Sequence, residues 1–191
     1  MSKGTQIEKS AYMKHLTKFI LKDGSTELTD ISLDDYSVFP KEFCPKLKVG
    51  FRAYYLQHGT RYENFLSNLH INEVNIGRQY QNGASAILQV FNNKLTPKTT
   101  LAILTFSKLM LNDCTKRGLI VFTDSIVEWS CRIFEKHIVD SETTVDWKAV
   151  LDCLERDSTE KPAEENLSSV IFVKCMLVIG VGCLFIGLVV R

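Results

Sequence analysis

Runs of like charge, strand-like alternation and a secretory signal are missing from this sequence. The 23 basic and 22 acidic residues leave a net charge of +1, and because no basic run stands out, we expect no binding of nucleic acid. Apolar and polar residues alternate with a period of two in no sustained stretch, so β-strands are not expected. The first residues, MSKGTQIEKSAYMKHLTKF, contain no uninterrupted apolar segment, which argues against secretion. These absences favour a helical protein whose bulk lies in the cytosol.

Constellations of catalytic or metal-binding residues are also missing. The six cysteines show neither a Cys-x-x-Cys pair nor metal-ligand spacing, and in a cytosolic domain we expect thiols, several of them filling the core. The four histidines are scattered, and the chain has no His-Glu-x-x-His motif, no Gly-x-Ser-x-Gly motif and no phosphate-binding loop. The paired carboxylates Asp34-Asp35 and Glu164-Glu165 fall in predicted loops. We therefore expect neither an enzyme nor a metal or cofactor.

One long apolar run is present, at the C-terminal end. From Val170 to Val190 there are 21 residues with a single charge, Lys174. About 20 apolar residues are needed to cross the hydrocarbon core of a bilayer, and a lysine near one end can extend to the headgroups. We therefore predict a C-terminal transmembrane helix over residues 170–191, with a buried helix of the domain as the alternative. Residues 158–169, polar and containing a proline, would form a tether.

The remaining residues, 1–157, show the spacing of amphipathic helices. Apolar residues recur every three or four positions, which predicts helices over roughly 5–22, 47–69, 80–91, 97–111, 116–137 and 145–154. Gly59 is a candidate break in the second of these, and residues 72–77 are expected to form a short connection or a weak helix. Thr143 or Thr144 is the expected N-cap of the last helix. The fold class is therefore predicted to be all-α.

Two of these helices are expected to lie at the centre of the domain. Thr96 as N-cap and Pro97 at the first helical position are a strong start signal. The residues that follow, 101–111, are apolar around most of the helix circumference, and such a helix must be surrounded by others. The next helix, 116–137, is again rich in apolar residues. A buried helical hairpin over residues 97–137 is therefore predicted.

This order of elements resembles that of the B-cell lymphoma 2 (Bcl-2) family of apoptosis regulators. The segment LKVGFRAYYLQHGTRYENFLSNLHI, residues 47–71, is similar to that family's second helix, and ILQVFNNKLTPKTTLAILTFSKLML, residues 87–111, to the stretch around its first homology motif. The segments WSCRIFEKHIV and VDWKAVL resemble the second motif, with Trp147 at the position of the tryptophan that caps the bundle. The resemblance implies a Bcl-2-like helical bundle, tail-anchored in the mitochondrial outer membrane or the endoplasmic reticulum.

The chain departs from that family at charged positions used in partner binding. The family's Asn-Trp-Gly-Arg falls on residues 97–100, Pro-Lys-Thr-Thr, so Thr100 stands where the family's arginine pairs with an aspartate of an incoming helix. In the third homology motif (BH3), Leu47 matches, but Phe51 takes the small position and Arg52 the acidic one. A chain without its own BH3 aspartate is a poor executioner, so the resemblance favours a survival protein.

The mechanism that the resemblance implies is recognition of a helix in a groove. An amphipathic BH3 helix of a pro-apoptotic Bcl-2 protein would lie in a hydrophobic cleft between the helix 47–69 and the helices 80–91 and 97–111. For each apolar candidate, packing in the bundle core is an equally good interpretation. The candidate groove residues are His58, Tyr62, Phe65, Leu69, Ile87, Val90 and Phe91, with Thr100 at the polar edge.

Two alternatives to the survival protein stay open at this point. The buried hairpin 97–137 could insert into a membrane, which would make the chain a pro-apoptotic effector. An unrelated tail-anchored helical adaptor would also have these helices and this C-terminal run. Pairing with partners as a homodimer or a heterodimer is compatible with each of the three readings.

Overall fold

The structure, a computed structural model, describes residues 14, 16–21, 42–67, 69–141 and 146–159. Every regular element within these residues is helical, and residues 16–21 are helical as well. This confirms the all-α prediction for the described part of the chain. The labelled elements are α2 (Phe43–Ser67), α3 (Ile76–Val90), α4 (Pro97–Lys116), the short 3-10 helix η3 (Ile120–Phe122), α5 (Thr123–Ser141) and α6 (Trp147–Thr159).

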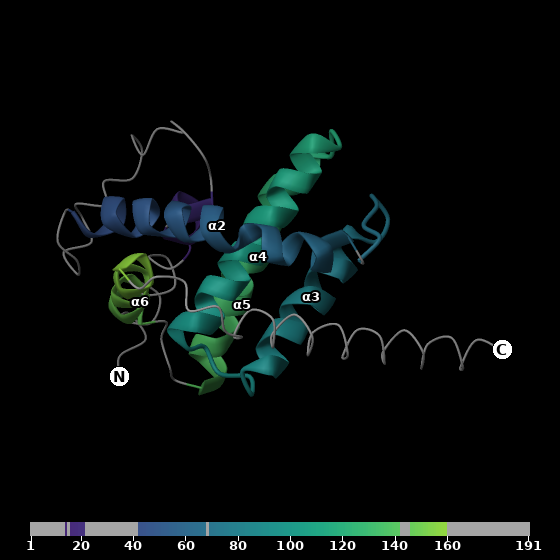
Figure 1. Ribbon diagram of the computed structural model, residues 1–191. Coiled ribbons are helices and arrows are strands. Elements are labelled where there is room, and N and C mark those ends of the chain that lie inside the picture. The colour runs from purple at the N-terminus through teal and green to yellow at the C-terminus, as the bar shows by residue number, and fades with distance from the viewer. Residues whose placement is uncertain (1–13, 15, 22–41, 68, 142–145, 160–191) are drawn as a thin grey trace.

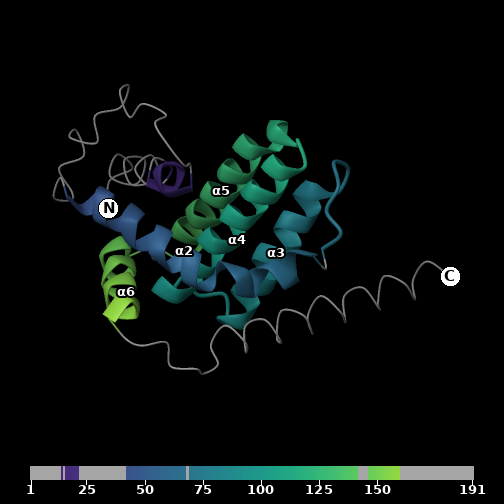
Figure 2. The same cartoon turned by 45° about the horizontal axis from the view of Figure 1, so that its top comes forward.

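Helix α4 is the centre of the bundle. It is contacted by α2, α3, α5 and α6, and Figures 1 and 2 show it running beside α5 with α2 crossing it. Its residues 99–111 are all buried, as the apolar character of this stretch requires. The predicted central helix is confirmed. It buries even the side chain of Lys108, whose Nζ donates to the carbonyl oxygen of Leu21 at 2.9 Å.

The start of α4 follows the predicted signal, and its end does not. The Thr96 Oγ1 accepts a hydrogen bond from the Thr99 amide at 3.2 Å, and Pro97 occupies the first turn. The helix continues to Lys116, five residues beyond the predicted end, and Gly118, with φ of +74°, stops it. The next helix was predicted to begin at residue 116; this is wrong, because the left-handed Gly118 and η3 come first and α5 begins at Thr123.

Helix α2 is longer at its start than predicted and has no break. It begins at Phe43 and runs through Gly59 to Ser67. A glycine costs a helix interior about 1 kcal/mol relative to alanine, but Phe51, Tyr62 and Phe65 on either side of Gly59 are all buried, and their packing holds the helix continuous. The predicted break at Gly59 is therefore wrong.

The connection between α2 and α3 is a turn built on asparagine. The Asn72 Oδ1 accepts from the amides of Val74 and Asn75, both at 3.0 Å. Helix α3 then begins at Ile76, so the last two residues of the predicted connection 72–77 belong to the helix. Gly83 allows α3 to approach α4 closely, since a Cβ at this position would lie 2.4 Å from the Phe106 Cζ.

Helix α6 closes the bundle by packing against α2 and α4. The Asp146 Oδ1 accepts from the Ala149 amide at 2.9 Å and caps the helix; Thr143 and Thr144, the predicted caps, lie outside the described residues. The buried Trp147 meets the ring of Phe134 edge-on at 6.1 Å.

The predicted anchor 170–191 lies outside the described residues, as does all of the tether except its first two residues. Among the helices that the structure describes, none combines the length and the apolar character needed to cross a membrane.

Candidate functional site

Half of the predicted groove residues belong to the core that α2 and α3 share with α4. Tyr62, Phe65, Leu69 and Ile87 are all buried, each less than 8% exposed. The Phe65 ring lies 5.5 Å from that of Phe106 on α4. These four side chains hold the bundle together, so a partner could reach them only if the helices above them moved.

Thr100 does not lie at a polar edge. Its side chain has no exposed surface, and its hydroxyl donates to the carbonyl oxygen of Thr96 at 3.0 Å. A threonine in the first turn of a helix commonly satisfies its hydroxyl in this way, by bonding the carbonyl four residues earlier. The predicted position of Thr100 at the polar edge of a groove is therefore wrong.

The remaining predicted residues are partly open to solvent. His58 is half-buried and its ring lies 4.4 Å from that of Tyr54. Val90 and Phe91, at the end of α3, are packed against the core while keeping some exposure. Leu56, on the outer side of α2, is 71% exposed. These four side chains are therefore the part of this region that is open to solvent.

Helices α2 and α3 both pack on α4, yet among the described residues they scarcely contact each other. We call the surface formed by the described side chains of residues 54–67 of α2 and of Leu69, together with residues 87–91, the α2–α3 face. Of the eight predicted groove residues, Thr100 is fully buried, Tyr62, Phe65, Leu69 and Ile87 are buried, and His58, Val90 and Phe91 are half-buried.

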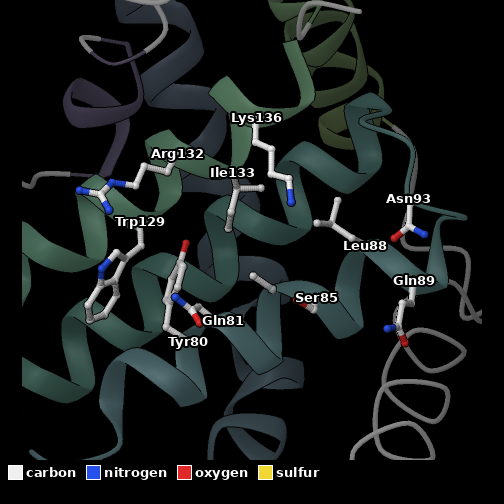
Figure 3. Close-up of a pocket in the computed structure, with 11 residues that line it drawn as sticks. Tyr80, Gln81, Ser85, Leu88, Gln89, Asn93, Trp129, Arg132, Ile133 and Lys136 are labelled. Atoms are coloured by element: carbon white, nitrogen blue, oxygen red, sulfur yellow. The ribbon is translucent and has the colours of Figure 1, made fainter. Parts of the chain in front are cut away.

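A cavity of about 620 Å³ lies on the other side of α3, between α3 and α5 (Figure 3). We call it the α3–α5 cleft. Its floor is apolar and aromatic, and its α3 rim carries amides and a hydroxyl. The residues that line it are Tyr80, Gln81, Ala84, Ser85, Leu88, Gln89, Asn93, Trp129, Arg132, Ile133 and Lys136.

The charge of the α3–α5 cleft has one sign. Arg132 and Lys136 are exposed and line it, and none of its eleven lining residues is acidic. Arg132 also lies 3.7 Å from Glu128 of the same helix, a long and solvent-exposed pair that contributes little. In Figure 3 the Lys136 side chain extends toward α3, between Ile133 and Leu88.

Three buried hydroxyls fix the inner wall of this cleft. The Tyr80 hydroxyl lies 2.8 Å from the Ser107 Oγ and 2.8 Å from the Ser130 Oγ, so α3, α4 and α5 meet at one hydrogen-bonded group. Burial raises the pKa of Tyr80 to about 12. The phenol therefore keeps its proton at neutral pH, and the cluster is suited to holding three helices in place.

Burial has the same effect on two thiols. Cys114 and Cys131 are buried, and desolvation raises the pKa of each to about 11. Thiols that stay protonated are poor nucleophiles, and the packing of Cys44, Cys114 and Cys131 in the core confirms that several cysteines serve there. Within the described ranges, no cluster of His, Cys, Asp or Glu could hold a metal ion.

Sequence reasoning missed the α3–α5 cleft because it assigned every apolar residue of α5 to the core. Trp129 and Ile133, four positions apart, are only half-buried. The available signal was the following Lys136 together with Gln81, Ser85 and Gln89, which repeat every four residues on α3. No protein-family model matches the chain, and no match to it is found among curated proteins.

Proposed function

We propose that this chain is a tail-anchored regulator of apoptosis, a survival protein that captures the BH3 helices of pro-apoptotic Bcl-2 proteins. Residues 170–191 hold it in the mitochondrial outer membrane or the endoplasmic reticulum, and the helical domain lies in the cytosol. The observation that carries the proposal is the pair α2 and α3, which both pack on the central α4 and scarcely contact each other. An amphipathic helix binds in a groove that has a helix on each side and an apolar surface between them.

Binding of a BH3 helix at the α2–α3 face requires this face to open. Phe65, Leu69 and Ile87 are buried in the free protein, so an incoming helix first contacts the half-buried side chains of Val90, Phe91 and His58 and then moves α2 and α3 away from α4. Part of the binding free energy is consumed by this separation. The floor that becomes available includes the ring of Phe106, now covered by Phe65.

The missing charge pair weakens binding without abolishing it. Thr100 stands at the position of the family's arginine and its hydroxyl is used within α4. Loss of a partly exposed charge pair costs on the order of 1–3 kcal/mol, whereas buried apolar anchors carry most of the energy of such interfaces. The BH3 helix is therefore recognised through its apolar residues, and the choice of partner differs from that of family members with the arginine.

The chain's own degenerate BH3 motif favours a survival protein over a pro-apoptotic effector. Arg52 is exposed on α2 at the position where the motif requires an acidic residue. Such a helix cannot offer the aspartate that a survival protein's groove recognises. The chain can receive a BH3 helix but is a poor donor of one.

The test is a titration of the full chain, in neutral detergent, with labelled BH3 peptides from pro-apoptotic proteins. We expect binding at or below about 10 μM and a weaker complex for Val90→Asp, which places a charge at the rim. The matched control is Val49→Asp on α2, at a side chain that is 70% exposed. Absence of binding by every peptide at tens of micromolar would exclude the groove and favour an unrelated adaptor.

Expression in cells given a death stimulus tests whether the chain promotes survival or death. Survival should rise with the full chain and fall back when residues 170–191 are deleted, because the anchor brings the groove to its partners. Increased death would instead favour the membrane-inserting effector.

A further inference from the structure

The α3–α5 cleft is not used by the proposed function, which places a BH3 helix on the opposite side of α3. From its shape and charge we infer that it is a second docking site and that its occupant is an acidic amphipathic helix of a partner protein. This inference does not rest on the function proposed above.

The floor of the cleft provides an apolar anchor site. Helices α3 and α5 meet at one end, where Trp129 lies 3.3 Å from the position that a Cβ on Gly77 would take and 5.5 Å from the Tyr80 ring. From there the cleft extends past Ile133 and Leu88 toward Asn93 (Figure 3). A volume of about 620 Å³ is large enough to accept several side chains of a partner.

The shape of the cleft suits a helix. Gln81, Ser85 and Gln89 follow one another at intervals of four on the exposed side of α3, over about 12 Å of helix axis. A third helix can pack between two others at an interaxial distance of about 8–10 Å. In the described part of the chain there is no strand, so an extended peptide would find no strand edge there to pair with.

The charge of the cleft selects an acidic partner. Lys136 extends across the apolar floor and Arg132 lies one turn before it, while no lining residue is acidic. A helix with glutamates or aspartates beside its apolar stripe would place carboxylates against both cations. A basic helix would meet like charge, and opposite charges at the rim of an interface chiefly decide which partner is accepted.

The cleft's inner wall is rigid, which favours binding without rearrangement. The Tyr80, Ser107 and Ser130 hydroxyls lie within 2.8–2.9 Å of one another and hold α3, α4 and α5 together. The cleft is therefore present in the free protein, unlike the buried part of the α2–α3 face, and a partner does not have to open it.

The experiment compares two peptides of about 18 residues, long enough to hold a helix when capped. Both carry leucines spaced three and four apart; one has glutamates beside the leucines and the other has lysines at the same positions. Fluorescence anisotropy with the full chain in neutral detergent should show the acidic peptide binding about tenfold tighter or more. Lys136→Glu should weaken it about tenfold, and Lys148→Glu, at an exposed site on α6, should leave it unchanged.

Trp129 reports where the peptide binds. The chain has two tryptophans, and in a Trp147→Phe background the emission of Trp129 should shift to the blue when the acidic peptide covers the cleft. Val90→Asp should not alter this shift, so failure here is separable from failure of the BH3 titration. Equal binding of both peptides, or no effect of Lys136→Glu, would overturn the inference. A shift produced by phosphatidylserine vesicles and not by the acidic peptide would overturn it in favour of a lipid surface.

Discussion

Replacing Gly83 with alanine tests the packing that supports both faces of α3. The new Cβ would lie 2.4 Å from the Phe106 Cζ and 2.9 Å from its Cε1. The ring cannot retreat easily, because it is fully buried with Phe65 and Tyr80 each 5.5 Å away. Alanine gains about 1 kcal/mol of helix propensity, and overpacking a core costs about 1–3 kcal/mol. Since the overlap is severe, we expect a net destabilisation of about 1–2 kcal/mol.

The assay is urea unfolding of the full chain in neutral detergent, followed by circular dichroism. The matched control is Gly77→Ala in the same helix, where the new Cβ would meet the half-buried Trp129 at 3.3 Å; we expect this variant to be as stable as the wild type or more so. In a double-mutant cycle, Phe106→Leu should recover part of the loss in Gly83→Ala by shortening the side chain. If Gly83→Ala proved as stable as Gly77→Ala, α3 would not lie this close to α4 and the derivation of both faces would be wrong.

Three further predictions concern the hydroxyl cluster and the helix ends. Tyr80→Phe should lower the free energy of unfolding by only about 1 kcal/mol at pH 8. Ser107 and Ser130 remain hydrogen-bonded to each other and to the carbonyl oxygens of Ile103 and Ile126. The pKa of Tyr80 is about 12 in the folded protein and about 10 in the unfolded chain, so the stability that the phenol provides is complete below pH 10 and is lost as the pH rises toward 12. Urea unfolding at pH 8 and pH 11 should therefore show a smaller difference in unfolding free energy between wild type and Tyr80→Phe at the higher pH. The same difference at both pH values would contradict a buried phenol. Asp146→Ala should lower stability by about 1 kcal/mol through loss of the α6 cap, whereas Asp152→Ala, exposed on the same helix, should change it by less than about 0.5 kcal/mol; equal effects would remove the capping argument. Gly118→Ala should cost about 1–2 kcal/mol, because its φ of +74° is strained for alanine and nothing lies near its Cβ; Gly118→Asn should lose less in the same assay, and the reverse order would contradict a left-handed stop.

The elements that could be predicted from the sequence are those fixed by local chemistry. Thr96 followed by Pro97 starts α4 where it was expected, and residues 101–111 are buried as an all-round apolar helix must be. The same reasoning failed at Gly59, because buried aromatic neighbours outweighed a weak local preference for a break. It also placed the end of α4 too early, since the left-handed conformation of Gly118 decides that boundary.

The site was harder to derive because exposure depends on which helices become neighbours. Phe65, Leu69 and Ile87 have the spacing of groove residues and of core residues alike, and all three are buried in the core of the free protein. Thr100 was read as a replacement for a charged residue at a surface, but its position in the first turn of α4 turns the hydroxyl inward. The α3–α5 cleft needed the pairing of two helices separated by the whole of α4, which periodicity does not encode.

Amide hydrogen exchange of the full chain, with and without a BH3 peptide, tests the central proposal most directly. If α2 and α3 are the walls of a helix-binding groove, exchange should slow at residues 58–66 and 87–91 when the peptide is added, and α6 should be unchanged. No change along α2 and α3 at a saturating peptide concentration, or protection confined to α6, would contradict the account.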